Sequence, residues 1–437
     1  MKYIVSHALT LGATDAIAEV YVGRERRIKF SNNEVVVAEE RDERSVEIFV
    51  AIREKRAAIS IDSLALPTVR KAVEQAFHLA EMSQPADVYA PLPKGPFKYD
   101  KKLLKAERIK GDPEKLTDAV EAAVNAALAE GAKRTAGTLI YSAGKSWLKT
   151  SGGAYGAAEE SSIELSIRAF ASDDATGHFV SIASRERDFK PEEAGRVAGE
   201  MAKMAVNPVE AEPGVYEALL GPMTFANFVE EIGESASAFH VDSGLSFLAE
   251  KLGEEVASEI FTLIDDPTLS GTYGACPFDD EGVPTRRKTI IDRGVLKTYL
   301  HNSTTAKKFD TETTANAGLI VPRPFNLIVN GGGESLDKLI SGIDDGIYVT
   351  NDWYLRYQNH RTGDFSTIPR DAMFRIRKGS IEGAIKELRI SDNMLSVFKN
   401  LRQLGKERYW ITWWEVETPV YAPHAVIEQL NFTKPTL

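Results

Sequence analysis

The first 210 residues alternate between strand-like and helix-like patterns of apolar and polar positions. Residues 19–30 and 34–39 flank Ser31-Asn32-Asn33, a turn-like tripeptide, so this segment predicts a β-hairpin. Further strand-like runs cover 44–53, 56–61, 137–142 and 162–170. Amphipathic helices are predicted at the N-terminus, from Pro67, from Pro113 to a stop at Gly131, and over 191–205. Strands mixed with helices predict an α/β arrangement for this part of the chain.

Residues 207–214, NPVEAEPG, are the clearest boundary, because two prolines and a glycine separate two periodic segments. We therefore expect two domains, 1–207 and 214–437. Beyond the boundary, residues 222–238 predict a helix whose apolar stripe is Phe225, Phe228, Val229 and Ile232. A second helical segment is predicted over 245–256. The remainder predicts strands. The expected fold class is therefore α+β, with a C-terminal domain that is mostly antiparallel β, barrel-like, and contains few helices.

Composition narrows the class of protein. The 437 residues carry 53 Lys plus Arg and 64 Asp plus Glu, a net charge of −11, which disfavours nucleic-acid binding. No apolar run reaches the roughly 20 residues of a membrane helix, and the N-terminus does not resemble a signal peptide. The single cysteine, Cys276, fits a reducing compartment, so we expect a cytoplasmic protein.

An acidic segment, 264–282, carries the strongest chemical signal. Five acids stand close together around a loop that contains glycine and proline, and two arginines follow them. These residues are Asp265, Asp266, Asp279, Asp280, Glu281, Arg286 and Arg287. They could bind a metal or a substrate amine, with the arginines as bidentate partners of the carboxylates. Alternatively, the acids accept backbone N–H groups in capped turns, which the absence of EF-hand spacing favours.

Residues 265–318 also carry a family resemblance. This segment resembles the characteristic block of the TldD/PmbA family in four motifs. They are the DDP opening, the F-DDEG-V core with Gly282 and its two arginines, the G-V-L-x-x-Y-L strand, and the closing T-x-N-A-G around Asn316. The resemblance implies an intracellular peptidase complex linked to peptide maturation and proteolysis. In that family a TldD-like subunit carries the zinc motif HExxxH, and a PmbA-like subunit, also called TldE, lacks it.

The zinc motif would fall on residues 229–234 when the two patterns are aligned without gaps from GEEVASEIFTLIDDPT (253–268). Val229 then takes the place of the first histidine and Glu234 that of the second, while Glu230 keeps the general-base position. An isopropyl group cannot bind zinc, and the seven histidines show no HxH, HxxxH or HxxxxH pattern. The resemblance therefore implies a PmbA-like subunit with no metal of its own. Glu230, Glu231 and Glu234 are predicted to form a solvated acidic face, with a remnant peptide groove as the alternative.

The resemblance further implies a TldD-like zinc peptidase as partner, an unfolded peptide as substrate, and a homodimer when the chain is alone. Two alternatives remain open. The chain could be a metal-dependent peptidase that uses the acidic cluster 265–281, or a protein-binding modulator, as the family's older name "modulator of DNA gyrase" suggests. Near the C-terminus, Trp410 and Trp414 are predicted to share one strand face and Trp413 the other, mainly as packing residues.

Overall fold

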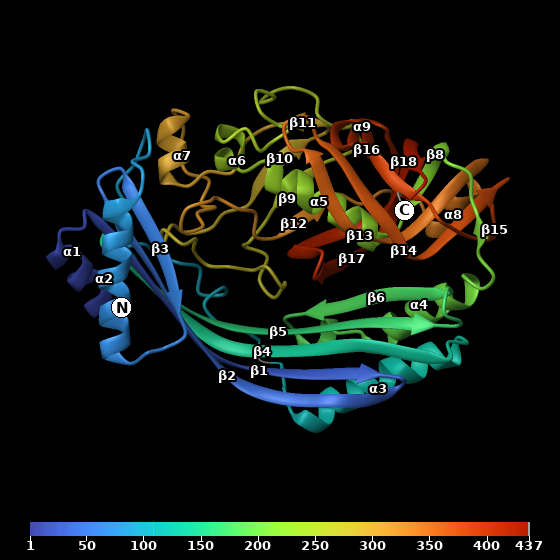
Figure 1. Cartoon of the computed structure of the whole chain (residues 1–437), viewed down its shortest axis with the longest axis horizontal. Helices are drawn as coiled ribbons and strands as arrows, with labels where there is room; N and C mark the ends of the chain where they lie inside the picture. The colour runs from blue at the N-terminus through green and yellow to red at the C-terminus, as the bar shows by residue number, and fades with distance from the viewer. Residues whose placement is uncertain (108, 436–437) are drawn as a thin grey trace.

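The computed structural model describes residues 1–107 and 109–435, which form two β-sheets, one above the other (Figure 1). The first sheet has six antiparallel strands in the order β3-β2-β1-β4-β5-β6. Their bounds are β1 (Asp15–Ser31), β2 (Glu34–Ile52), β3 (Lys55–Ile61), β4 (Arg134–Thr150), β5 (Tyr155–Phe170) and β6 (Thr176–Ala183). The predicted hairpin is β1–β2, with its turn at Asn32 and Asn33, which both have positive φ.

Four helices pack on this sheet: α1 (Lys2–Leu11), α2 (Leu66–Met82), α3 (Pro113–Ala129) and α4 (Pro191–Met204). α1 and α2 pack on β1–β3 through a small core that includes Ile4, Val5 and Val73. α3 and α4 pack on each other and on β4–β6. A Cβ added to Gly195 on α4 would lie 2.0 Å from the carbonyl oxygen of Ala123 on α3. The two helices therefore approach so closely that only glycine fits at this contact.

The second sheet contains twelve strands in the C-terminal half. They are β7 (Val209–Glu210), β8 (Gly214–Leu220), β9 (Leu263–Asp265), β10 (Lys288–Asp292), β11 (Val295–Leu296), β12 (Leu327–Val329), β13 (Asp345–Asn359), β14 (Asp364–Arg377), β15 (Ser380–Lys386), β16 (Arg389–Asn393), β17 (Leu401–Trp413) and β18 (Val416–Thr433). The pairings β8–β13–β14–β16–β18–β8 return to their starting strand and so close a ring. Most pairs are antiparallel, and the expected α+β class with a barrel-like second half is confirmed.

The long helix of this half is α5 (Pro222–Ser235), which packs against β13, β17 and β18. Phe225, Phe228, Val229 and Ile232 are fully buried, as their spacing predicted. The short helices are α6 (Ala238–Asp242), α7 (Ser303–Lys308), α8 (Leu336–Ser341) and α9 (Met394–Lys399).

The helix predicted over 245–256 is wrong, because this segment forms turns. Gly244 and Gly253 both have positive φ, and the Ser246 hydroxyl donates to the Ser235 carbonyl and accepts from the Leu248 N–H. These bonds satisfy the backbone without a helix. The alternation predicted for the tryptophans also fails at its end, because β17 stops at Trp413 and Trp414 lies in the following turn, half exposed.

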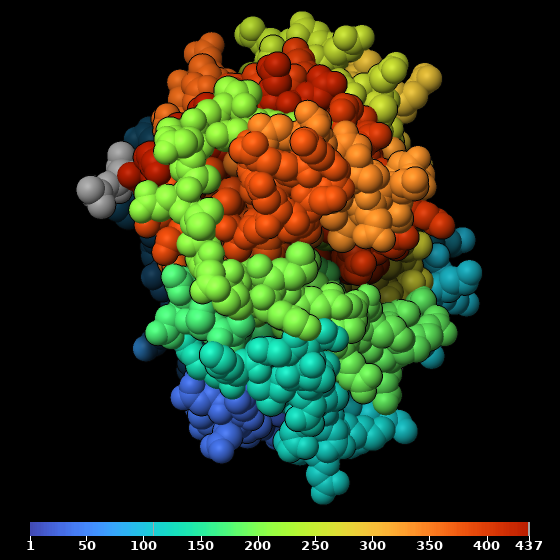
Figure 2. All heavy atoms as spheres, turned by 90° about the vertical axis from the view of Figure 1, so that its right-hand side faces the viewer, coloured from blue at the N-terminus to red at the C-terminus, as the bar shows by residue number. Residues whose placement is uncertain are grey.

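The two halves share one hydrophobic core, which runs from α3, α4 and the first sheet into the C-terminal barrel. The ring of Phe179 on β6 meets that of Tyr409 on β17 edge to face, at 5.5 Å between centroids. Figure 2 shows the halves in contact, with the segment around residue 210 (light green) crossing between them. The division into two domains stays a sequence prediction. Within the described residues, no helix is long and apolar enough to cross a membrane.

Polar side chains also join the two halves. The buried His178 lies 2.8 Å, through Nε2, from the Ser166 hydroxyl, and its Nδ1 lies 2.8 Å from the side-chain amide of Asn351. Asn351 also donates to Asp371, which pairs with Arg168. Because the amide donates to Nδ1, the imidazole is neutral and carries its proton on Nε2. Burial lowers the pKa of His178 to about 4, consistent with this state.

Candidate functional site

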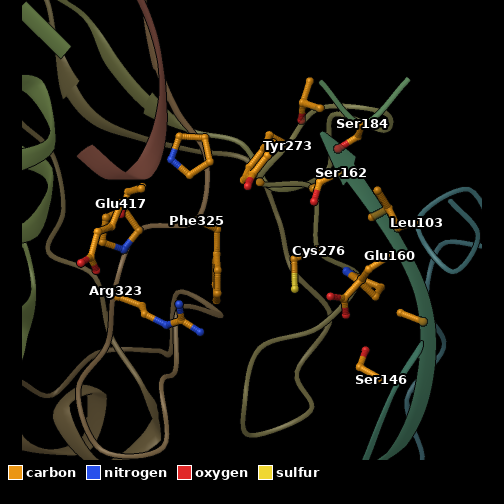
Figure 3. A pocket seen from close by; sticks show the side chains of 18 of the residues that line it. Leu103, Ser146, Glu160, Ser162, Ser184, Tyr273, Cys276, Arg323, Phe325 and Glu417 are labelled. Atoms are coloured by element: carbon orange, nitrogen blue, oxygen red, sulfur yellow. The ribbon is translucent and has the colours of Figure 1, made fainter. Parts of the chain in front are cut away.

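A cavity with a volume of about 940 Å³ lies between the two halves of the molecule. Strands β1, β4 and β5 form one wall, and α5 with the β17–β18 turn forms another. The loop 270–280, residues 323–325, residues 102–107 and Arg356 also line the cavity. Figure 3 shows Ser146, Glu160 and Ser162 on one side and Arg323, Phe325 and Glu417 on the other. The cavity is therefore assembled from segments that are far apart in the sequence.

The lining is strongly acidic. Eleven of the lining residues are carboxylates and four are cationic. The acids are Glu19, Glu107, Glu159, Glu160, Glu230, Glu231, Glu234, Asp279, Asp280, Glu415 and Glu417, and the cations are Lys102, Lys105, Arg323 and Arg356. Like charges brought together in a partly desolvated space repel one another, so such a cavity attracts cations.

Three of these acids stand on α5 and form what we call the helix cluster: Glu230, Glu231 and Glu234. Burial raises the pKa of Glu230 to about 8 and those of Glu231 and Glu234 to about 7. The Thr418 N–H donates to the Glu230 carboxylate. The prediction that these residues form a solvated helix face is wrong, because the β17–β18 turn and the first sheet enclose them.

A second group, the sheet cluster, consists of Glu19 on β1, Glu160 on β5 and Asp280 in the loop after residue 270. Burial raises the pKa of Glu19 to about 8 and that of Asp280 to about 6, and it also raises that of Glu160. The Arg323 guanidinium lies 3.9 Å from the Asp280 carboxylate. Both clusters therefore hold carboxyl groups that are protonated part of the time near neutral pH.

Cys276 also lines the cavity, but its thiol has the character of a structural group. The thiol donates to the Phe278 carbonyl, with 2.9 Å between Sγ and the oxygen. Burial raises the pKa of Cys276 well above its ordinary value, and nearby Glu160 and Asp280 raise it further. A thiol that stays protonated is a poor nucleophile, so the arrangement does not favour cysteine chemistry.

The acids of the 264–282 segment have separate roles, and that of Asp265 is structural. Its fully buried carboxylate accepts from the backbone N–H groups of Phe325 and Asn326, at 3.0 and 2.9 Å, and from the Asn316 amide at 2.7 Å. Lys288, which sequence reasoning did not single out, supplies the countercharge at 3.1 Å. Asp265 thus joins three strand ends and is not free to bind a ligand.

Asp279, Glu281 and Gly282 form a tight turn. Asp279 accepts from the N–H groups of Glu281 and Val283 and from that of Ala317. Glu281 accepts from the backbone N–H of Ser303 at the start of α7. Gly282 has a φ of 79°, which favours glycine.

Asp266 and the two arginines serve the surrounding loops. Asp266 caps the following turn by accepting from the Thr268 N–H, and Arg287 lies 3.7 Å from it. Arg286 donates to the Thr313 carbonyl. The capped-turn interpretation therefore fits four of the five acids. Asp279 and Asp280 both line the cavity, and Asp280 is the one that lies next to Arg323.

The donors needed for a zinc site do not meet in this cavity. Val229, at the position of the first histidine of the family motif, is fully buried in the core. None of the residues that line the cavity in the described part of the chain is a histidine. Nor does any group of three His, Cys, Asp or Glu side chains among those residues stand where it could hold a metal ion. The residues present therefore do not fit a catalytic zinc ion, which needs three protein ligands.

Sequence reasoning missed Glu19, Glu160, Arg323 and Glu417, which come from four separate segments. A signal existed in β5, where Glu160, Ser162 and Glu164 alternate with buried residues of the opposite face such as Ile163 and Leu165. A strand whose second face is polar predicts solvent or a cavity on that face. The pattern does not say which of the two it is.

Comparison with known proteins supports the resemblance in the sequence. Residues 213–434 match the family model of the PmbA/TldA metallopeptidase C-terminal domain. A metalloprotease of Methanothermobacter thermautotrophicus is 31% identical over 228 residues, 49% of this chain and 48% of the relative. The metalloprotease PmbA of Escherichia coli O157:H7 is 30% identical over 164 residues, 37% of this chain and 34% of the relative. The chain thus spans about half the length, or less, of these curated relatives.

The solved structures match over nearly the whole chain. A candidate modulator of DNA gyrase from Thermotoga maritima has a TM-score of 0.84, 25% identity and 99% coverage of both chains. TldE from Thermococcus kodakarensis also has a TM-score of 0.84, with 21% identity and 99% coverage of both chains, and shows the same fold. The family model covers half of the chain, and the solved structures extend the likeness to both sheets. This chain belongs to the PmbA/TldD metallopeptidase family.

Proposed function

We propose that this chain is a non-catalytic, PmbA/TldE-like subunit of a TldD-type metallopeptidase complex. In this proposal, a homologue that carries HExxxH supplies the zinc ion, and this chain contributes a chamber for unfolded peptide. The observation that carries the proposal is the environment of Val229. Its side chain is fully buried among Phe225, Phe228 and Ile232, while the acids beside it on α5 line the cavity.

The cavity supports the second part of the proposal. Its volume of about 940 Å³ accommodates several residues of an extended chain. Tyr273, Phe325 and the half-exposed Trp414 add aromatic surface to the polar walls. A mixture of aromatic and charged groups suits an unfolded peptide, whose side chains vary along its length.

The test is co-expression with a HExxxH-bearing homologue from the same genome, with a tag on only one chain. We expect the two chains to copurify and the assembly to bind zinc and hydrolyse unstructured peptides. A matched control replaces both histidines of the homologue by alanine, which should abolish hydrolysis and preserve copurification. The proposal fails if the chains do not associate, or if this chain alone hydrolyses peptides once zinc is added.

A further inference from the structure

Arg323, a cation of the lining whose side chain is 55% exposed, lies between the two acidic clusters of the cavity. Arg323 lowers the pKa of Glu234 in the helix cluster as well as that of Asp280 in the sheet cluster, so its guanidinium acts on both. Figure 3 shows Arg323 on the side of the cavity opposite Glu160. Among the other cations of the lining, Lys102 and Lys105 are exposed to solvent. Arg356 lies 3.7 Å from Glu415 and also lowers the pKa of Glu231 in the helix cluster.

Protein donors satisfy the carboxylates of the helix cluster only in part. Glu230 is only 9% exposed, and one of its oxygens, Oε1, accepts from the Thr418 N–H. Its other oxygen, Oε2, accepts from no residue in the described part of the chain. A carboxylate oxygen that faces the cavity is open to an incoming cation, whose N–H groups would form charge-assisted hydrogen bonds with it.

The cavity is much larger than one metal ion requires, and its aromatic walls suit a long side chain. The methylene groups of lysine and arginine pack on aromatic surface while the charged end reaches a carboxylate. Tyr273, Phe325 and Trp414 provide that surface, and cations are attracted to the faces of such rings. Carboxylates in two clusters can therefore receive the charged ends of two side chains of one extended segment.

We propose that the cavity binds extended peptide segments that carry lysine or arginine side chains and disfavours segments rich in aspartate or glutamate. This inference rests on the proposed role of the cavity as a peptide chamber and names the chemical class of peptide that it takes. Arg323 is the lining cation that acts on both clusters and partly neutralises them when no peptide is bound. Removing its charge should increase the attraction for a cationic peptide.

The test uses the full-length chain and three fluorescently labelled, unstructured ten-residue peptides, observed by fluorescence anisotropy at pH 8. The peptides share a Gly/Ser background and carry two lysines, two glutamines or two glutamates. We expect the lysine peptide to bind about tenfold more tightly than the glutamate peptide, with a preference that shrinks as salt screens the charges.

Variants assign the preference to the cavity. Glu230→Gln combined with Glu234→Gln should reduce the affinity for the lysine peptide about threefold to tenfold, and Arg323→Gln should increase it. Glu312→Gln combined with Glu407→Gln removes the same charge from exposed positions outside the cavity and should leave the affinity unchanged. Circular dichroism melts confirm that each variant is folded.

Each outcome is decisive. Equal binding of the three peptides would overturn the preference for cationic peptides, but it would leave the proposed role of the cavity as a peptide chamber intact. If the exposed control variant removes the preference as fully as the cavity variant does, the assignment to this cavity is overturned. The net charge of the protein would then explain the preference. Absence of binding by all three peptides overturns this inference, whereas copurification with the HExxxH homologue tests the subunit role separately.

Discussion

Replacing Lys288 by methionine tests whether the acidic segment holds the fold together. The Lys288 side chain is 8% exposed, and its Nζ lies 3.1 Å from the Asp265 carboxylate and 2.7 Å from the Asn316 amide oxygen. Removing one partner of a buried ion pair costs about 3 to 5 kcal/mol, because the other charge is left uncompensated. Asp265 keeps three N–H donors, so we expect a loss near the lower end, about 3 kcal/mol.

The assay is urea unfolding at pH 7, monitored by tryptophan fluorescence. Lys308→Met is the matched control, since Lys308 pairs with Asp242 at 2.7 Å but its side chain is 32% exposed, and exposed pairs contribute about 0.5 kcal/mol. The double variant Asp265→Asn/Lys288→Met should recover part of the stability, because it leaves no unpaired charge. A Lys288→Met variant no less stable than Lys308→Met would refute the reasoning.

Three further predictions follow from burial and close packing. The pKa of Glu230 is raised from 4.5 to about 8, so the folded protein loses stability as the pH rises from 4.5 to 8. Glu230→Gln should therefore raise the free energy of unfolding by about 2 kcal/mol at pH 8 and hardly at pH 4.5. Equal gains at both pH values in urea unfolding would contradict this. The pKa of His178 is lowered from 6.5 to about 4, so as the pH falls the unfolded state binds the proton before the folded state does. The free energy of unfolding therefore falls by as much as about 3 kcal/mol between pH 6.5 and pH 4. His178→Gln should flatten that part of the pH profile, and an unchanged slope would argue against it. Gly195→Ala should lower the free energy of unfolding by about 2 kcal/mol, because the added Cβ would meet a backbone oxygen. Gly383→Ala, which has open space around it, is the control and should change the urea midpoint little. Similar midpoints for the two variants would exclude the close helix contact.

Periodicity predicted the faces of elements better than their surroundings. The apolar stripe of 222–238 placed Val229 in the core correctly, because a helix buries the side on which its apolar residues recur. The same pattern placed Glu230 and Glu234 in solvent. Helical spacing does not report what lies opposite the polar side, and here the first sheet and the β17–β18 turn enclose it.

Strand extents were underestimated where the apolar alternation breaks. β4 runs over Arg134–Thr150, well past the predicted 137–142, because Gly144, Lys145 and Ser146 continue the pairing with β5 without an apolar pattern. β6 was missed altogether, since its residues Thr176–Ala183 are buried on both faces and show no alternation. The cavity itself depends on contacts between distant segments, which single-sequence patterns do not contain.

The hydrophobic core that passes from α3 and α4 into the C-terminal barrel has a consequence for unfolding. A protein whose halves had separate cores would melt in two steps, each half with its own calorimetric peak. Here the contact of Phe179 with Tyr409 and the polar bonds around His178 tie the halves together, so loss of one half exposes apolar surface of the other. The chain should therefore melt in a single cooperative transition, and residues 1–207 expressed alone should aggregate rather than form a stable fragment.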